Sequence, residues 1–177
     1  MLEHGEKIIG GVRFIMKALQ LDHAYIGIED NKMDAVNHLK ELVGGAKDIT
    51  VQALRTRYPQ GAEKQLIQAI TGREVPPGKL PADVGCCVFN AATTAAIYDA
   101  VALGLPVYQR VITITGSAVK NPVNLLAPVG TPFSHLIEEA GGFNGTPARV
   151  ISGGPMMGFA VDDFGASVTK GVNAVTC

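Results

Sequence analysis

Tryptophan is absent from this sequence of 177 residues, and aromatic residues make up only 6% of it. Cysteine occurs three times, at Cys86, Cys87 and Cys177, and two neighbours in sequence cannot form an unstrained disulfide bridge. A framework of disulfides is therefore excluded, and a reducing, cytoplasmic compartment is favoured. No Cys-x-x-Cys motif occurs and the four histidines lie in unrelated segments, so we expect no metal site within the chain.

An excess of charge of one sign is also lacking, because 15 basic and 16 acidic side chains give a net charge of −1. The sequence has no basic stripe that could neutralise phosphates, which excludes nucleic acid as a partner. No apolar run reaches the roughly 18 residues that span a bilayer, and the first residues lack the apolar region of a signal peptide. We expect a soluble chain that does not insert into a membrane.

Glycine (21 residues), proline (10 residues) and apolar residues (47% of the sequence) are abundant, as is typical of a compact, turn-rich globular protein. In the first hundred residues, segments of helical periodicity alternate with short extended runs. Helices are predicted over 8–19, 35–43, 62–70 and 91–103, and strands over 24–28, 49–54 and 85–89. This alternation predicts a parallel sheet with helical crossovers, that is, a Rossmann-like α/β domain.

Beyond residue 105 the spacing changes from crossovers to hairpins. Strands are predicted over 107–115 and 123–127, followed by a helix with Thr131 as its cap and Pro132 as its first residue. Further extended segments are predicted over 149–151 and 167–175. Two strands, a helix and more strands predict a small β-grasp domain, so residues 1–105 and 106–177 are expected to form separate domains.

Polar residues follow the predicted strands, where the ligands of open parallel sheets bind. Glu29 and Asn31 lie in a loop that can contact a ribose or a flavin ring, although a solvated loop is the alternative. Glu63 opens a helix, where the helix dipole favours any acidic residue. Asn90 and Thr93 lie at a strand-to-helix turn, where they can bind a phosphate or simply cap the helix.

Two other segments are more typical of structure than of chemistry. Cys86 and Cys87 lie in an apolar run, and we interpret them as small buried strand residues, with a redox pair as the alternative. The segment 153–158, Gly-Gly-Pro-Met-Met-Gly, lacks the Lys-Ser/Thr that completes a P-loop. We interpret it as a tight turn with its methionines packed nearby.

Several longer motifs resemble the C subunit of Rnf-type electron-transport complexes. They are the runs at 57–66 (RYPQGAEKQL), 71–76 (TGREVP), 80–85 (LPADVG) and 153–158, and the resemblance extends over essentially the whole chain. That family is related to the flavoprotein subunit of respiratory complex I, whose Rossmann-like domain binds FMN and oxidises NADH. The stretch from about Val111 onward resembles the soluble-ligand-binding (SLBB) β-grasp domain that follows it.

The resemblance implies hydride transfer between NADH and FMN, and then single electrons passed to 4Fe-4S clusters. Glu63 matches the acidic residue of the family's Gly-x-Glu segment, while Asn90 and Thr93 match its strand-end turn. Glu29 and Asn31 occupy the loop that faces the flavin and the nicotinamide in the complex I relative. The family's glycine-rich FMN loop lies before this chain and its cysteine-rich cluster region after it. We therefore expect a fragment with half an FMN site, no tightly bound cofactor and little activity of its own.

The partners implied by the resemblance are NAD(H) and the other subunits of an ion-translocating membrane complex. The chain is expected to lie peripherally on the cytoplasmic side of the membrane. Two alternatives stay open: a cobalamin-reductase-like flavoprotein of the same family, and a non-catalytic scaffold that docks partner subunits through its β-grasp domain. Cys177 is either the edge of the iron–sulfur region or an ordinary residue.

Overall fold

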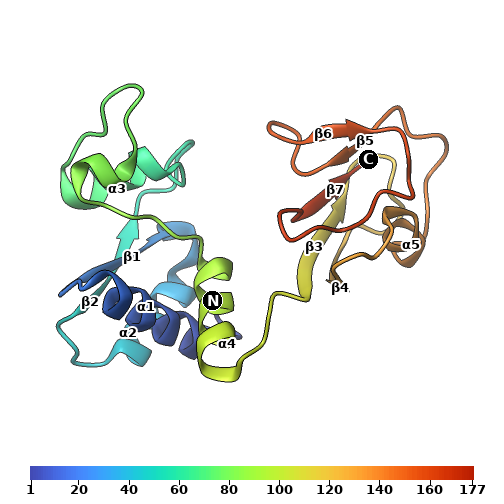
Figure 1. Ribbon diagram of the computed structural model, residues 1–177. Coiled ribbons are helices and arrows are strands. Elements are labelled where there is room, and N and C mark those ends of the chain that lie inside the picture. The colour runs from blue at the N-terminus through green and yellow to red at the C-terminus, as the bar shows by residue number, and fades with distance from the viewer. The chain divides into compact units, whose positions relative to one another are not determined.

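The structure, a computed structural model, describes all 177 residues, which form two compact units, Met1–Leu105 and Pro106–Cys177 (Figure 1). The first unit contains a parallel sheet with helices, and the second contains a mixed sheet of five strands with one α-helix. This architecture confirms the predicted fold class, a Rossmann-like α/β domain followed by a β-grasp-like domain. Neither unit contains a helix with the length and hydropathy that crossing a bilayer requires.

The first unit is built on two parallel strands. β1 (Ala24–Glu29) pairs with β2 (Ile49–Leu54) along its whole length, with Ala24 opposite Ile49 and Glu29 opposite Leu54. The remaining elements are α1 (Gly5–Leu19), the 3-10 turn η1 (Asp30–Lys32), α2 (Met33–Val43), α3 (Glu63–Thr71), the 3-10 turn η2 (Pro81–Val84) and α4 (Ala91–Leu103). The chain thus runs from β1 through α2 to β2, as a parallel connection requires.

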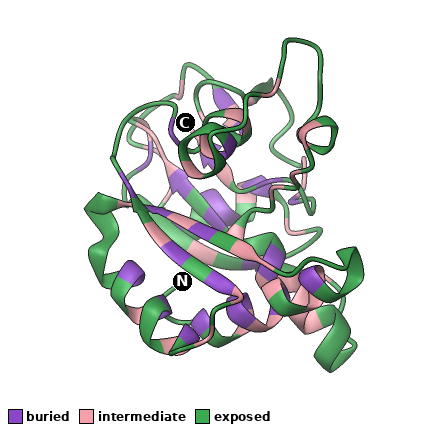
Figure 2. Cartoon of the chain, turned by 90° about the vertical axis from the view of Figure 1, so that its left-hand side faces the viewer, coloured by how far each residue is buried: buried purple, intermediate pink, exposed green.

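The core of this unit lies between the strands and the first two helices. Buried side chains alternate with more exposed ones along β1 and β2, so each strand presents one apolar face (Figure 2). The buried cluster includes Ile8, Ile9, Met16, Ile26, Ile28, Val36, Leu39, Ile49 and Val51. On the other face of β1, a Cβ at Gly27 would lie within 3 Å of Leu66 and Leu54. Glycine at this position therefore lets α3 approach the sheet closely.

α4 is held against α1 by close backbone contact. Thr94 is the only buried residue of α4, and the apolar residues of this helix are not gathered into one stripe. A Cβ on Gly11 would overlap the main-chain oxygen of Thr94, so α1 must carry glycine there. An ion pair adds to the contact, because Lys7 Nζ lies 2.9 Å from Asp99 Oδ1.

The strand predicted over 85–89 is wrong. The sheet of this unit contains β1 and β2 alone, and the segment between η2 and α4 pairs with neither. Cys86 and Val88 are half-buried while Cys87 and Phe89 are exposed, so the segment has the alternation of a strand. It is not a strand, because no neighbouring strand lies beside it to accept its hydrogen bonds. The interpretation of both cysteines as buried strand residues fails for the same reason.

The second unit is a five-stranded sheet in the order β4-β3-β7-β5-β6. β3 (Gln109–Thr115) forms a hairpin with β4 (Val123–Pro128) and runs parallel to β7 (Ala174–Thr176). β5 (Val150–Ser152) lies between β7 and β6 (Phe159–Val161) and is antiparallel to both. α5 (Phe133–Glu139) packs its buried residues against the sheet, in a cluster that includes Ile112, Ile114, Phe133, Leu136, Val150, Val168 and Val175.

The start of α5 differs from the prediction. Pro132 is the residue before the helix instead of its first residue, and no side chain caps the helix. The hydroxyl of Thr131 donates to the carbonyl of Pro128 at 2.8 Å, so it stabilises the preceding turn. A threonine two residues before a helix can bond either to the first turn of the helix or to the preceding turn. Here the Thr131 hydroxyl bonds to the preceding turn.

The methionines of the 153–158 segment do not pack against the protein, contrary to the prediction. Met156 is 71% exposed and Met157 is 93% exposed. The segment is a tight turn, as predicted, because the Gly158 N–H donates to the Gly154 carbonyl at 2.8 Å. The turn joins β5 to β6 at the end of a short hairpin, where no other element is within reach of the side chains.

Replacement of Gly11 by alanine is expected to destabilise the protein, because the added methyl group would push α1 away from α4. Overpacking of this kind costs about 1–3 kcal/mol of unfolding free energy. Gly45→Ala is the matched control, since a Cβ there meets nothing within 4 Å, and its effect should stay within about 0.5 kcal/mol. Urea unfolding followed by circular dichroism measures both, and equal midpoints would show that the α1–α4 contact is not tight.

Candidate functional site

The carboxyl ends of β1 and β2 are joined by a small hydrogen-bond cluster. Asp30, the first residue after β1, accepts hydrogen bonds at Oδ1 from both the N–H and the hydroxyl of Thr56, at 3.0 and 2.6 Å. The N–H of Asn31 donates to the same threonine hydroxyl oxygen at 3.2 Å. Glu29 is the last residue of β1 and lies 3.9 Å from Lys32. The loop that carries Glu29 and Asn31 is therefore fastened to the loop after β2.

These contacts change the acidity of Asp30. The Thr56 hydroxyl is the first cause and the Thr56 N–H the second, and together they hold the pKa of the Asp30 carboxyl below its ordinary value. A nearby positive charge on Arg55 acts in the same direction. Hydrogen bonds donated to a carboxylate favour its charged form, so Asp30 stays ionised at neutral pH.

Glu63 begins α3, as the sequence predicts, and its side chain is exposed. No hydrogen bond or ion pair involves its carboxylate, and Ala62 before it provides no side-chain cap. The preceding loop contains Gln60, which is buried, and Tyr58, which is 81% exposed. The positive end of the helix dipole stabilises an anion here, whether it is the side chain of Glu63 or part of a ligand.

Asn90 caps α4, since its Oδ1 accepts a hydrogen bond from the N–H of Ala92 at 2.9 Å. Of the two roles that the sequence left open for Asn90, helix capping and ligand binding, the structure shows the first. Thr93, in contrast, is exposed and its hydroxyl makes no hydrogen bond, whereas the next residue, Thr94, donates to the Asn90 carbonyl at 3.1 Å. The side-chain N–H groups of Asn90 and the hydroxyl of Thr93 remain available to a ligand.

The structure brings some of the candidate residues together and not others. Glu29 and Asn31 share one edge of the sheet with Thr56, a residue that sequence reasoning missed. Thr56 could have been found only from the register of β1 and β2, which places Asp30 beside the first residues after β2. The sequence predicts Asn90 at this edge only because it predicts a parallel strand over 85–89. Because no strand forms over 85–89, this reason no longer holds. The position of Asn90 is set by its place at the start of α4.

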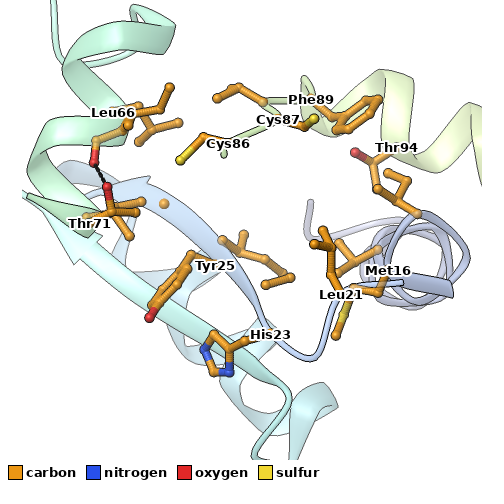
Figure 3. A pocket seen from close by; sticks show the side chains of 18 of the residues that line it. Met16, Leu21, His23, Tyr25, Leu66, Thr71, Cys86, Cys87, Phe89 and Thr94 are labelled. Atoms are coloured by element: carbon orange, nitrogen blue, oxygen red, sulfur yellow. Dashed lines mark hydrogen bonds between the residues drawn. The ribbon is translucent and has the colours of Figure 1, made fainter. Parts of the chain in front are cut away.

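A groove of about 640 Å³ lies beside β1 in the first unit (Figure 3). Its walls are parts of α1, β1 and α3, residues 85–89, and Ala91 and Thr94 of α4. None of the five candidate residues lines it. The polar edge of the sheet and the groove are thus two separate features, and the sequence indicated only the first.

Comparison with known proteins assigns both units to families. Residues 1–99 match the model of the Nuo51 FMN-binding domain, and residues 111–160 match the SLBB domain. The chain is 50% identical over 175 residues to the C subunit of the proton-translocating ferredoxin:NAD(+) oxidoreductase complex of Clostridium ljungdahlii, a match that covers 99% of this chain and 38% of that protein.

Two further relatives give the same result. The chain is 46% identical over 177 residues to the C subunit of the Na(+)-translocating ferredoxin:NAD(+) oxidoreductase complex of Acetobacterium woodii, covering 100% of this chain and 40% of that one. It is 42% identical over 175 residues to the C subunit of the ion-translocating oxidoreductase complex of Pseudomonas aeruginosa, covering 99% and 22%. The chain spans about two fifths or less of the length of these curated relatives.

The resemblance read from the sequence is thereby confirmed, and none of these three names favours the cobalamin-reductase alternative. Because a flavin-domain model fits residues 1–99 and three C subunits match almost the whole chain, the protein belongs to the Nuo51 FMN-binding domain family, among the C subunits of Rnf-type ion-translocating complexes.

Proposed function

We propose that the first unit forms part of the FMN and NADH site of an ion-translocating ferredoxin:NAD oxidoreductase. The observation that carries the proposal is the match of residues 1–99 to an FMN-binding domain, combined with the polar edge at the ends of β1 and β2. FMN, when bound, supplies the chemistry that takes a hydride from NADH and passes electrons on singly. The protein contributes binding, orientation and charge.

The residues at the start of α4 fit the phosphate of a nucleotide. Asn90 and Thr93 keep unpaired donors there, and the helix begins with Ala91 and Ala92, whose small side chains leave the main chain accessible. The N–H groups of the first helical turn and the helix dipole favour a bound anion. These residues would donate hydrogen bonds to phosphate oxygens.

The carboxylates fit a different part of the ligand. Glu63 and Glu29 can only accept hydrogen bonds when ionised, so they suit the hydroxyl groups of a ribityl or ribose chain, or the carboxamide N–H of a nicotinamide. Asn31, in the same loop as Glu29, offers both a donor and an acceptor. The Asp30–Thr56 cluster would hold this loop in place before the ligand arrives, which reduces the entropy lost on binding.

The relatives' names support a complex of several subunits as the wider setting, and the rest of the setting is our proposal. We propose that the chain works within a complex of several subunits, peripheral on the cytoplasmic side of the membrane, and that 4Fe-4S clusters of the full-length subunit receive the electrons. The SLBB unit would contribute to docking between subunits, because Met156 and Met157 expose flexible apolar side chains at a hairpin tip. Binding of the isolated SLBB unit to the other subunits tests this role.

The pKa of Asp30 provides a test of the loop cluster. Thr56→Val keeps the shape of the side chain but removes the hydroxyl that bonds both Asp30 and Asn31. We expect the Asp30 pKa, measured by carbon-13 NMR titration, to lie below 3.8 in the wild type and to rise toward that value in the variant. The stability supplied by Asp30 is present above its unfolded pKa and is lost as the pH falls through its lowered folded pKa. Thr146→Val, an exposed threonine in the other unit, should leave the titration unchanged.

Substitutions at Asn90 and Glu63 test the site in the full-length subunit. Asn90→Asp keeps the helix cap, since aspartate caps as well as asparagine, but removes the donors and adds a charge that repels phosphate. We expect Asn90→Asp and Glu63→Gln to weaken FMN binding or NADH oxidation about ten- to hundredfold, as for loss of a hydrogen bond worth about 1.5–3 kcal/mol. Thermal unfolding should change little.

The matched control is Glu41→Gln, an exposed residue on α2, which should leave flavin content and NADH turnover unaltered. If Asn90→Asp and Glu63→Gln both retain wild-type flavin content and turnover, these two residues act in the helices alone and the site assignment is wrong.

A further inference from the structure

α3 is held to the first unit by few buried side chains. It begins with Glu63, and Ile67 is its only buried residue. Leu66 and Ile70 rest over Gly27 of β1, where a Cβ would lie 2.8 and 3.1 Å from their side chains. A short helix is fixed mainly by the apolar face that it buries, so this contact alone leaves α3 free to pivot. The position of Glu63 therefore depends on further contacts.

Arg73, the second residue after α3, provides a contact of this kind. Its Nη1 donates hydrogen bonds to the carbonyls of Val84 and Gly85, at 2.9 and 3.2 Å. The same nitrogen lies 3.6 Å from the Sγ atom of Cys86. Val84 ends η2, and the next two residues open the segment that leads to α4. One guanidinium thus ties the end of α3 to the approach to α4.

The conformation of Gly85 allows the guanidinium to approach. Its φ of 68° lies in the left-handed region, and a Cβ there would lie 3.3 Å from Arg73 Nη1. The turn is closed by its own hydrogen bonds, because the N–H of Gly85 donates to Ala82 and the N–H of Cys86 donates to Pro81, both at 3.0 Å. The acceptors of Arg73 therefore belong to an ordered turn, and its hydrogen bonds fix one element against another.

The other side-chain hydrogen bonds that leave α3 end in the loop that follows it. Lys64 Nζ donates to the Pro76 carbonyl at 3.5 Å, and Gln68 Nε2 donates to Glu74 Oε1 at 3.2 Å. Neither bond reaches η2 or the segment before α4. These two bonds hold the loop to α3 without fixing α3 relative to α4.

α4 is the fixed side of the connection. Close backbone contact with α1 at Thr94 holds α4 in place, and Asn90 caps its first turn. Only residues 86–89 separate Asn90 from the two carbonyls that Arg73 binds. A helix of nine residues moves as one body, so fixing its last turn while its middle rests on β1 also sets the direction of its first turn.

We propose that Arg73 positions the nucleotide site by fixing Glu63, at the start of α3, relative to Asn90, at the start of α4. It does so through its bonds to Val84 and Gly85 and does not itself touch the ligand. The inference rests on the proposed function, in which both helix starts bind FMN or NADH. Misplacement of a binding group by about 1 Å costs up to about a hundredfold. Loss of the tie would therefore weaken binding without removing any group that contacts the ligand.

Substitution of Arg73 in the full-length subunit tests the tie. We expect Arg73→Ala to weaken FMN affinity, or to raise the KM for NADH, about tenfold, because Glu63 is no longer held in place relative to Asn90. Arg73→Lys keeps the charge and a single donor group, so it should lose less. Arg13→Ala is the matched control, since Arg13 is exposed on α1, and it should leave both quantities unchanged. Flavin fluorescence titration and steady-state kinetics measure them.

A double-mutant cycle distinguishes positioning of Glu63 from a purely structural role. If Arg73 acts through Glu63, the variant that combines Arg73→Ala with Glu63→Gln should be about as impaired as the more impaired single variant, since coupled residues are not additive. Multiplied effects, or wild-type affinity and KM in both Arg73 variants, would overturn the inference. If Arg73→Ala does not fold, as thermal unfolding shows, Arg73→Lys takes its place in the cycle. Wild-type values in both Glu63→Gln and Asn90→Asp would instead contradict the proposed function, and the inference would fall with it.

Discussion

The six-residue parallel pairing of β1 with β2 is the interaction on which the first unit depends. It turns the buried isoleucines of β1 toward α1 and α2, and it leaves Gly27 on the face where α3 approaches. The same register places Asp30 next to Thr56, because both residues follow the ends of paired strands. One edge of β1 stays unpaired as a result, and this edge borders the groove.

In this arrangement the candidate ligand-binding side chains lie outside the groove beside β1. Charged and hydrogen-bonding side chains gather after the strands and at the starts of α3 and α4, where main-chain dipoles favour anions. The groove beside β1 is lined by apolar side chains together with polar ones such as Asp22, His23 and Thr71.

The sequence predicted most elements but could not show their partners. A helix was predicted over 91–103, which agrees with Ala91–Leu103 in the structure, although its apolar residues form no single stripe. Alternation over 85–89 is equally strong, yet a strand exists only where a neighbour supplies hydrogen bonds, and periodicity does not reveal that neighbour. The Asp30–Thr56 contact escaped prediction because it requires the strand register. Asn90 is recognisable in the sequence as a polar helix start, but a cap and a ligand-binding group have the same sequence signature.

A structure of the full-length subunit with bound FMN would test most directly the central claim that the starts of α3 and α4 and the loop after β1 bind the cofactor. We expect flavin or phosphate density within hydrogen-bond distance of Asn90, Thr93 or Glu63. Flavin density that contacts none of these residues, nor Glu29 or Asn31, would contradict the assignment.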